Sequence, residues 1–200
     1  MPTEHSTSST EGTAMTAGEH RPVQRLLVGV TGSLAAYGIP IYLNYFRTHL
    51  AHEIRVIPTA SASRMLPAEG LAHLCDGIHT NEFDAEYGHV RLARWADLLL
   101  IAPATANVLA NAAHGTASTL LTSTILAHPR PAVFAPNMNP LMWERPVVQR
   151  NVQTLRTDGH IVIDPVHMPA YESAEKRTEP GYVMPPPADL ARMLTEALST

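Results

Sequence analysis

The chain has 200 residues, 45% of them apolar and 16% charged, and this composition excludes a protein that is disordered along its whole length. Its 14 basic and 18 acidic side chains give a net charge of −4 without any basic cluster, so nucleic acid is not an expected partner. No apolar run is long enough to cross a bilayer, and the first residues lack a signal-peptide pattern. The single cysteine, Cys75, and 11 histidines without metal-ligand spacing lead us to expect a cytoplasmic protein with no disulfide, no metal and no membrane partner.

The first elements in chain order are a polar segment and a set of short apolar runs. Residues 1–22 contain eight Ser or Thr and no Ile, Leu, Val, Phe, Tyr or Trp, so we expect residues 1–23 to form a disordered tail. Five short apolar or β-branched runs follow, each closed by turn residues, which is typical of buried strands. They are residues 25–30, 53–57, 98–102, 132–135 and 160–163.

Apolar residues recur at helical spacing between and after these runs. The spacing predicts helices within residues 35–50, 148–155 and 190–198, with Pro40 kinking or restarting the first and Pro187 starting the last. Because strands and helices alternate, we predict a single-domain α/β fold, a Rossmann-like (flavodoxin-like) doubly wound parallel sheet.

The flavoprotein-type domain is expected to span residues 24–163, and the chain changes character after it. Residues 164–187 carry six prolines, a charged centre and little periodicity. Such an irregular segment is either a functional loop, here a flap that covers the substrate, or a linker to the last helix. Residues 188–200 are predicted to form a C-terminal helix that packs on the domain.

Small, hydroxyl and amide residues follow the predicted strands, where an open parallel sheet binds its ligands. Gly32 and Ser33 suit a phosphate because a strand-to-helix turn offers backbone N–H groups and the positive end of a helix dipole. A plain turn glycine and a helix-capping serine explain them equally well. Thr59 and Ser61 form a second hydroxyl-rich turn, which strengthens the phosphate interpretation.

Other candidates have both a functional and a structural interpretation. Asn107, Asn137 and Asn139 carry amides that recognise a planar ring or a carboxylate, but asparagine also caps helices and forms turns. Met142 and Trp143 form either an apolar wall of a site or part of the core.

Three longer motifs follow one another along the chain in the order and spacing that one protein family shares. They are residues 29–33 (GVTGS), residues 89–107, which begin with HVRL and end with IAPATAN, and residues 136–143 (PNMNPLMW). With them the chain resembles the homo-oligomeric flavin-containing cysteine decarboxylases over roughly residues 25–160. It is most similar to the peptidyl-cysteine decarboxylases of lanthipeptide and linaridin-type antibiotic biosynthesis. This family also includes the phosphopantothenoylcysteine decarboxylases and, more distantly, flavin prenyltransferases.

The resemblance implies a flavoprotein that assembles as a homotrimer or a homododecamer of trimers, with the flavin near subunit contacts. FMN is the expected cofactor, and FAD stays open because both share the riboflavin phosphate. His89 matches the active-site histidine and Asn139 the residue that meets the substrate carboxylate. The implied cofactor-binding residues are Gly32, Ser33, Thr59, Ser61, Thr105, Ala106, Asn107 and Met138. The implied substrate-binding residues are Pro136, Asn137, Asn139, Met142, Trp143 and Tyr171.

The activity within the family follows from the position of one cysteine. Phosphopantothenoylcysteine decarboxylases resemble one another in a flap cysteine that helps to reduce the intermediate, whereas residues 164–187 contain none. The resemblance therefore implies oxidative decarboxylation of the C-terminal cysteine of a ribosomal precursor peptide to an aminoenethiol, the step that leads to aminovinyl-cysteine. The alternatives are phosphopantothenoylcysteine decarboxylase of coenzyme A synthesis and a catalytically silent flavin-binding regulatory subunit.

Two parts of the chain depart from the family pattern or lack a match. Residues 114–119 (HGTAST) lack the acidic residue of the coenzyme A branch, which leaves one flavin or subunit contact in doubt. The flap itself has no clear counterpart, so four of its residues are only candidates for covering a peptide. They are Met168, Tyr171, Tyr182 and Met184.

Overall fold

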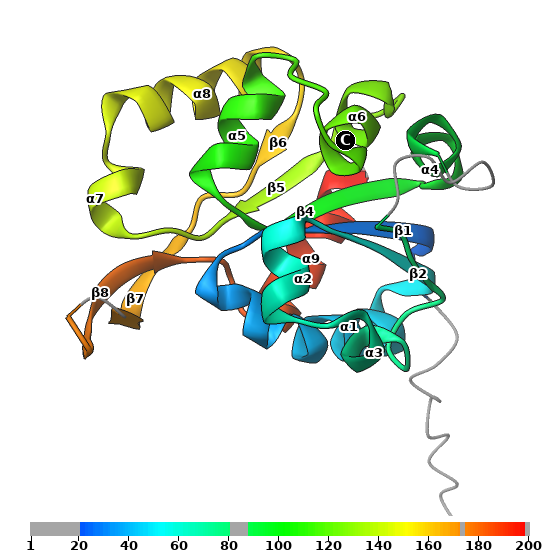
Figure 1. Cartoon of the computed structure of the whole chain (residues 1–200), viewed down its shortest axis with the longest axis horizontal. Coiled ribbons are helices and arrows are strands. Elements are labelled where there is room, and N and C mark those ends of the chain that lie inside the picture. The colour runs from blue at the N-terminus through cyan, green and yellow to red at the C-terminus, as the bar shows by residue number, and fades with distance from the viewer. Residues whose placement is uncertain (1–20, 81–87, 173–174, 199–200) are drawn as a thin grey trace, which may run out of the picture.

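The computed structural model describes residues 21–80, 88–172 and 175–198 (Figure 1). Within these residues, the main sheet has strands in the order β3-β2-β1-β4-β5-β6, and every adjacent pair is parallel. This is the strand order of the doubly wound Rossmann fold, whose direction reverses between β1 and β4. The predicted fold class is confirmed. The strands are β1 Val23–Val30, β2 Ala51–Pro58, β3 Gly77–Ile78, β4 Leu98–Ala104, β5 Val133–Pro136 and β6 Ile161–Val162.

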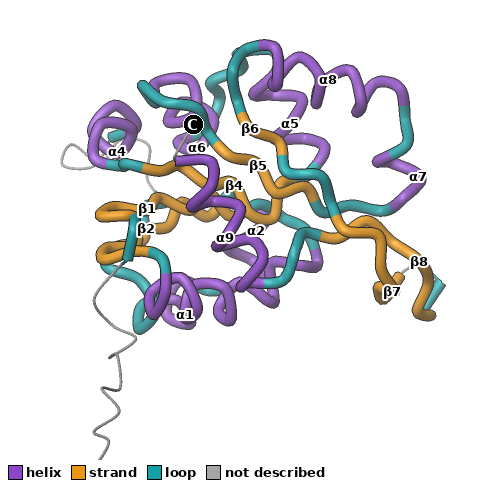
Figure 2. Tube along the Cα trace, turned by 180° about the vertical axis from the view of Figure 1, so that it is seen from behind, coloured by secondary structure: helices purple, strands orange, loops and turns teal. Residues whose placement is uncertain are grey.

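Helices cover both faces of this sheet, with α1 and α9 on one side and α5, α6 and α8 on the other (Figures 1 and 2). A short 3-10 helix, η1, precedes α1. The helical elements are η1 Leu34–Gly38, α1 Ile39–His49, α2 Ala60–Met65, α3 Ala68–Leu71, α4 His89–Trp95, α5 Ala106–Ala113, α6 Leu120–Ala127, α7 Pro140–Trp143, α8 Pro146–Thr157 and α9 Pro187–Leu198. None of the helices in the described parts of the chain reaches the length and hydropathy of a membrane span.

The central strand β1 is buried on both faces, as its unbroken apolar run predicts. Leu26 and Val28 pack into the core under α1 and α9, while Leu27 packs into the core under α6 and α8. At Gly29 the packing with α6 is so close that an added Cβ would clash with the end of the Leu121 side chain. A larger residue at this point of β1 would therefore require Leu121 to shift.

Several element boundaries differ in detail from the prediction. Pro40 lies in the first turn of α1, directly after η1, so the restart predicted at this proline is confirmed. Strand β1 begins at Val23, the last residue of the predicted tail, and residues 1–20 lie outside the described residues. Strand β3 was not predicted, because two residues carry no periodicity.

The segment 164–187 was expected to be irregular, and this expectation was wrong. Strands β7 (Val166–Glu172) and β8 (Arg177–Val183) form an antiparallel hairpin that extends from the carboxyl end of the sheet. Pro169 stands directly opposite Pro180 in its register. A two-stranded ribbon has two open edges, so prolines can stand where the missing N–H would face outward. The proline content therefore misled the prediction.

Candidate functional site

Thr31 joins the two central strand ends at the point where the strand order reverses. Its buried Oγ1 donates a hydrogen bond to the Pro103 carbonyl (2.6 Å) and accepts one from the Thr105 N–H (3.1 Å). The Thr105 side chain in turn accepts a hydrogen bond from the Val108 N–H and caps α5. The turn after β1 and the start of α5 are therefore held together before any ligand binds.

The turn after β1 also lies directly against the first turn of α2. A Cβ added at Gly32 would lie 2.5 Å from the Cβ of Ser61, so only glycine fits between the two turns. Thr59 caps α2 by accepting from the Ala62 N–H. Ser33, by contrast, makes no capping bond, and its Oγ accepts a hydrogen bond from Asn137 Nδ2 (2.9 Å).

Asn137 connects the hairpin to the floor of the site. By the floor we mean the turn after β1, the start of α5 and the segment that follows β5. Besides its bond to Ser33, its Oδ1 accepts a hydrogen bond from the Met184 N–H (3.2 Å), just after β8. The next residue, Met138, forms an isolated antiparallel bridge with Tyr182 of β8. The base of the hairpin is thus attached to the segment that follows β5.

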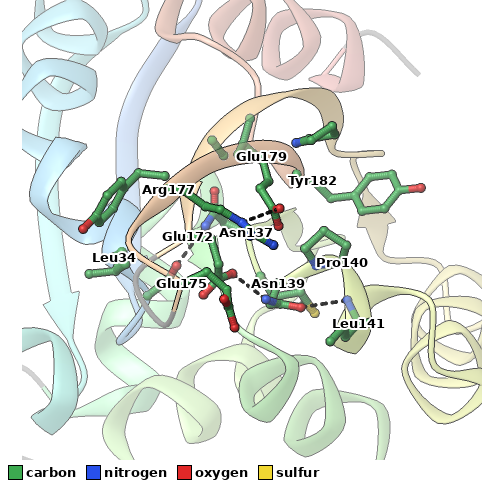
Figure 3. A pocket seen from close by; sticks show the side chains of 17 residues that line it. Leu34, Asn137, Asn139, Pro140, Leu141, Glu172, Glu175, Arg177, Glu179 and Tyr182 are labelled. Atoms are coloured by element: carbon green, nitrogen blue, oxygen red, sulfur yellow. Dashed lines mark hydrogen bonds and ion pairs between the residues drawn. The ribbon is translucent and has the colours of Figure 1, made fainter.

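A cavity of about 680 Å³ lies between this floor and the hairpin (Figure 3). Its walls come from η1, from the segment after β5 and from both hairpin strands. The lining residues are Ser33, Leu34, Asn137, Met138, Asn139, Pro140, Leu141, Ala170, Tyr171, Glu172, Glu175, Arg177, Glu179, Pro180, Gly181, Tyr182 and Val183.

Asn139 lies on the floor of the cavity with both ends of its amide engaged. Its Oδ1 accepts a hydrogen bond from the Leu141 N–H (2.8 Å) and caps α7, so its Nδ2 must face the other way. That Nδ2 donates to the carboxylate of Glu172, at the end of β7 (Figure 3). The capping role and the carboxylate-binding role considered for this asparagine are therefore both present in one side chain.

The predicted site residues divide into three groups around this cavity. Five line it: Ser33, Asn137, Met138, Asn139 and Tyr171. The remaining predicted cofactor residues lie in the adjoining turns at the carboxyl ends of β1, β2 and β4: Gly32, Thr59, Ser61, Thr105, Ala106 and Asn107. Three predicted substrate residues do not line the cavity: Pro136 and Trp143 are buried, and Met142 is exposed.

Of the four flap candidates, Tyr171 and Tyr182 line the cavity. Met184 is buried in the core, and Met168 is exposed outside the cavity lining. The sequence did not single out the charged residues of the hairpin that line the cavity, Glu172, Glu175, Arg177 and Glu179. The charged centre of segment 164–187 was the one sequence feature that could have indicated them. Their position at the cavity depends on the register of the hairpin, which that feature does not reveal.

His89 is the predicted catalytic residue that this chain does not bring to the cavity. It is the first residue of α4, it is exposed, and it is not among the lining residues. Helix α4 packs against α6, at the end of the molecule opposite to the β7–β8 hairpin in both views (Figures 1 and 2). Val90, which follows His89 in α4, and Leu126 of α6 are exposed apolar residues.

Cys75 is also remote from the cavity, between α3 and β3. Its Sγ donates to the Leu71 carbonyl (3.3 Å), and burial raises the pKa of this thiol above its usual value. A partly buried thiol with a raised pKa is a weak nucleophile and reductant. None of the described residues that line the cavity carries a thiol.

These features define a class: an α/β domain with a ligand site at the switch point of its sheet, made of a glycine turn, two capped helix starts and an amide-lined cavity. The family model described as "Flavoprotein" matches residues 15–194, and the chain belongs to this family. The family predicted from the three motifs is confirmed.

Individual relatives show which members of this family the chain resembles. The mersacidin decarboxylase of Bacillus sp. (strain HIL-Y85/54728) is 44% identical over 172 residues, which cover 84% of this chain and 88% of that protein. Its structure, MrsD, superposes with a TM-score of 0.75, covering 88% of this chain and 96% of that one at 38% identity. The FMN-dependent cysteine decarboxylase SpaF has a TM-score of 0.72 at 35% identity and covers 88% of this chain and 98% of its own.

The coenzyme A branch of the family is similar over a shorter stretch. The bifunctional CoaBC protein of Mycolicibacterium smegmatis is 42% identical over 145 residues, which cover 71% of this chain and 35% of that protein. The similarity to mersacidin decarboxylase extends over nearly the full length of both proteins, and the similarity to CoaBC does not.

The residues at the switch point fit a flavin phosphate. The turn at Gly32 leaves no room for a Cβ, and the Ser33 hydroxyl and the start of α5 lie beside it. Backbone N–H groups and a helix N-terminus are the groups that bind phosphate in such folds. The turn residues predicted for the cofactor therefore lie where a flavin phosphate would need them.

Proposed function

We propose that this protein is a flavin-dependent peptidyl-cysteine decarboxylase, which converts the C-terminal cysteine of a ribosomal precursor peptide to an aminoenethiol. The observation that carries the proposal is the Asn139 amide, fixed by its cap to α7, whose Nδ2 holds a carboxylate inside the cavity. A C-terminal carboxylate is the group that such a peptide would present there. The similarity to mersacidin decarboxylase and SpaF supports the same reaction class.

FMN is the cofactor that the family and its FMN-dependent member SpaF support. When bound, FMN would supply the two-electron oxidation of the substrate cysteine. Gly32, Ser33, Thr59 and Ser61 would hold its phosphate, and the start of α5 with Met138 would border the rest of the cofactor. The peptide then loses carbon dioxide together with two hydrogens.

Asn139 suits a carboxylate that must leave. A cationic side chain would stabilise the carboxylate and oppose its loss, whereas a neutral amide orients it without that cost. The amide is also pre-positioned, because the Leu141 N–H fixes its orientation before substrate binds. Asn139 therefore positions the scissile bond.

His89 is proposed to move the proton of the substrate thiol, since the ordinary histidine pKa of about 6.5 lies near working pH. It lies far from the cavity of its own chain, so it would serve the cavity of a neighbouring copy. The exposed Val90 of the same helix and the exposed Leu126 of α6, which packs against α4, provide apolar surface for such a contact. We therefore propose a homo-oligomer in which each site combines residues of two subunits. A trimer or a dodecamer of trimers meets this requirement.

The second candidate is phosphopantothenoylcysteine decarboxylase, which the CoaBC similarity favours. The hairpin that covers the cavity has no cysteine, and the half-buried Cys75 is not at the cavity. Without a thiol at the cavity, the intermediate would leave as an enethiol, so the peptide reaction is the better proposal. The free thiol also accords with a cytoplasmic location.

The test is incubation of the flavin-loaded protein with synthetic peptides that end in cysteine, followed by mass spectrometry. We expect a mass loss of about 46, the sum of carbon dioxide and two hydrogens removed in the flavin-dependent reaction. Peptides that end in serine serve as the control, because they have no thiol to oxidise. No mass loss on any cysteine peptide, including one encoded near this gene, contradicts the proposal.

A further inference from the structure

The carboxylate that Asn139 holds belongs to the protein itself. Glu172 is the last residue of β7, and its carboxylate accepts the Nδ2 hydrogen bond that the proposed function assigns to the substrate. Asn139 has no second orientation available, because Leu141 fixes its Oδ1. The substrate carboxylate and Glu172 therefore need the same donor group.

The substrate carboxylate and the Glu172 carboxylate cannot both bind Asn139 without a large electrostatic penalty. The second hydrogen of Nδ2 is available in principle, but two carboxylates on one amide nitrogen would lie within about 6 Å of each other, where like charges disfavour full ionisation. The cavity also contains Glu175, which adds to the negative charge around a bound carboxylate, whereas Arg177 offsets the charge of Glu179. Substrate binding therefore requires Glu172 to leave Asn139.

The hairpin provides a second partner for Glu172. Arg177, the first residue of β8, stands directly opposite Glu172 in the register of the two strands. Directly opposed residues of an antiparallel pair have neighbouring side chains. Arg177 binds Glu179 (2.6 Å), and its guanidinium has five N–H donors, enough for two carboxylates.

We propose that Glu172 is an internal competitor of the substrate, which occupies the carboxylate position on Asn139 until a C-terminal carboxylate displaces it, and that Arg177 then receives it. The base of the hairpin stays attached through Tyr182 and Met184 during this exchange. A ligand without a terminal carboxylate does not need the Asn139 donor and leaves Glu172 in place. Glu172 thereby lowers the affinity for free C-termini and has little effect on ligands without one. This inference rests on the proposed function, because it takes Asn139 as the carboxylate ligand.

The test measures binding of one peptide in two forms to the full-length, flavin-loaded protein. The probe is an acetylated peptide of four alanines and a C-terminal serine, as the free acid and as the C-terminal amide, because serine binds without turnover. In Glu172→Ala we expect the affinity for the acid to rise about tenfold, the value of a charge-assisted hydrogen bond that no longer has to be broken. The affinity for the amide should change less than about twofold.

Glu175→Ala is the matched control, because it removes the same charge from the same cavity without a contact to Asn139. We expect it to change the ratio of acid to amide affinity by less than about twofold, whereas Arg177→Gln should lower the acid affinity by about threefold. An acid affinity that is unchanged in Glu172→Ala, or that rises equally in Glu175→Ala, overturns the competitor role. A disturbed hairpin would alter acid and amide binding together, so the ratio separates misfolding from competition.

Asn139→Ala separates this inference from the proposed function. If Asn139→Ala abolishes the preference for the acid but Glu172→Ala leaves it unchanged, only the competitor role is wrong. If Asn139→Ala binds both forms as the unaltered protein does, or none of the proteins binds the acid, the carboxylate-binding role of Asn139 itself is contradicted.

Discussion

The floor of the cavity and the β7–β8 hairpin above it are built in opposite ways. The floor consists of short polar side chains that are joined to each other and to backbone, as Thr31 is to Pro103 and Thr105, and Ser33 is to Asn137. The hairpin is mostly exposed and carries long charged side chains, and one of them, Glu172, reaches across the cavity. The fold thus fixes the proposed cofactor-binding part in advance, whereas the proposed substrate-facing part depends on contacts that can be exchanged.

The largest effect is expected from His89, which belongs to neither region. His89→Asn should lower kcat by at least about 100-fold, the usual contribution of a general acid or base, while flavin binding stays intact. His73→Asn, a change at another exposed histidine, is the control. Steady-state kinetics on a cysteine peptide provide the measurement.

Mixed oligomers test whether His89 serves a neighbouring subunit. Co-expression of His89→Asn with Asn139→Ala chains should restore part of the activity, because some sites would then combine an intact His89 with an intact Asn139. Two inactive variants that stay inactive when co-assembled would contradict a site shared between subunits.

The hydrogen bonds that preform the floor can be removed by a substitution at Thr31. Thr31→Val leaves the buried Pro103 carbonyl and Thr105 N–H without their partner and should lower the free energy of unfolding by about 1–3 kcal/mol. Thr124→Val is the matched control, since that buried hydroxyl bonds only the Leu120 carbonyl of its own helix. Urea denaturation measures both, and an equal loss in the two variants would show that the junction of β1 and α5 has no special role.

A smaller effect is expected from filling the turn at Gly32. Gly32→Ala places a Cβ against Ser61, separates the turn from α2 and should weaken FMN binding by about tenfold, as loss of a phosphate hydrogen bond does. Gly70→Ala adds the same atom where nothing lies within 4 Å. A fluorescence titration of apoprotein with FMN compares the two, and identical affinities would remove Gly32 from the phosphate site.

The smallest expected effect is a pH dependence of stability. It arises from two histidines outside the floor and the hairpin. Burial lowers the pKa of His128 and of His160 below the ordinary value of 6.5, with nearby Arg130 also lowering that of His128. The unfolded chain therefore takes up protons first, so these histidines favour the folded state above pH 6.5 and that stability is lost as the pH falls below it. Urea denaturation between pH 8 and pH 5.5 should show this decline, and His128→Gln should make it shallower. The same slope in His128→Gln would exclude His128 as its source.

The contrast between floor and hairpin also separates what the sequence could and could not predict. The central strands β1, β4 and β5 were predictable because each is a short, mostly buried run that ends in a turn, as β1 does at Thr31 and Gly32. The hairpin was not, because prolines and charges give no alternating pattern in a ribbon that is exposed on both faces. Asn139 was found through its motif. Its contact with Glu172 lies between residues 33 positions apart and follows from the hairpin's position over the floor, which no local pattern encodes.

The most direct test of the whole account offers the protein both substrates at once. Flavin-loaded protein is incubated with equal amounts of a precursor peptide ending in cysteine and of phosphopantothenoylcysteine, and the products are weighed by mass spectrometry. The account predicts that the peptide loses about 46 mass units, carbon dioxide and two hydrogens, while the small substrate is left unchanged. Loss of carbon dioxide alone from the small substrate, about 44 mass units, with the peptide untouched would contradict it.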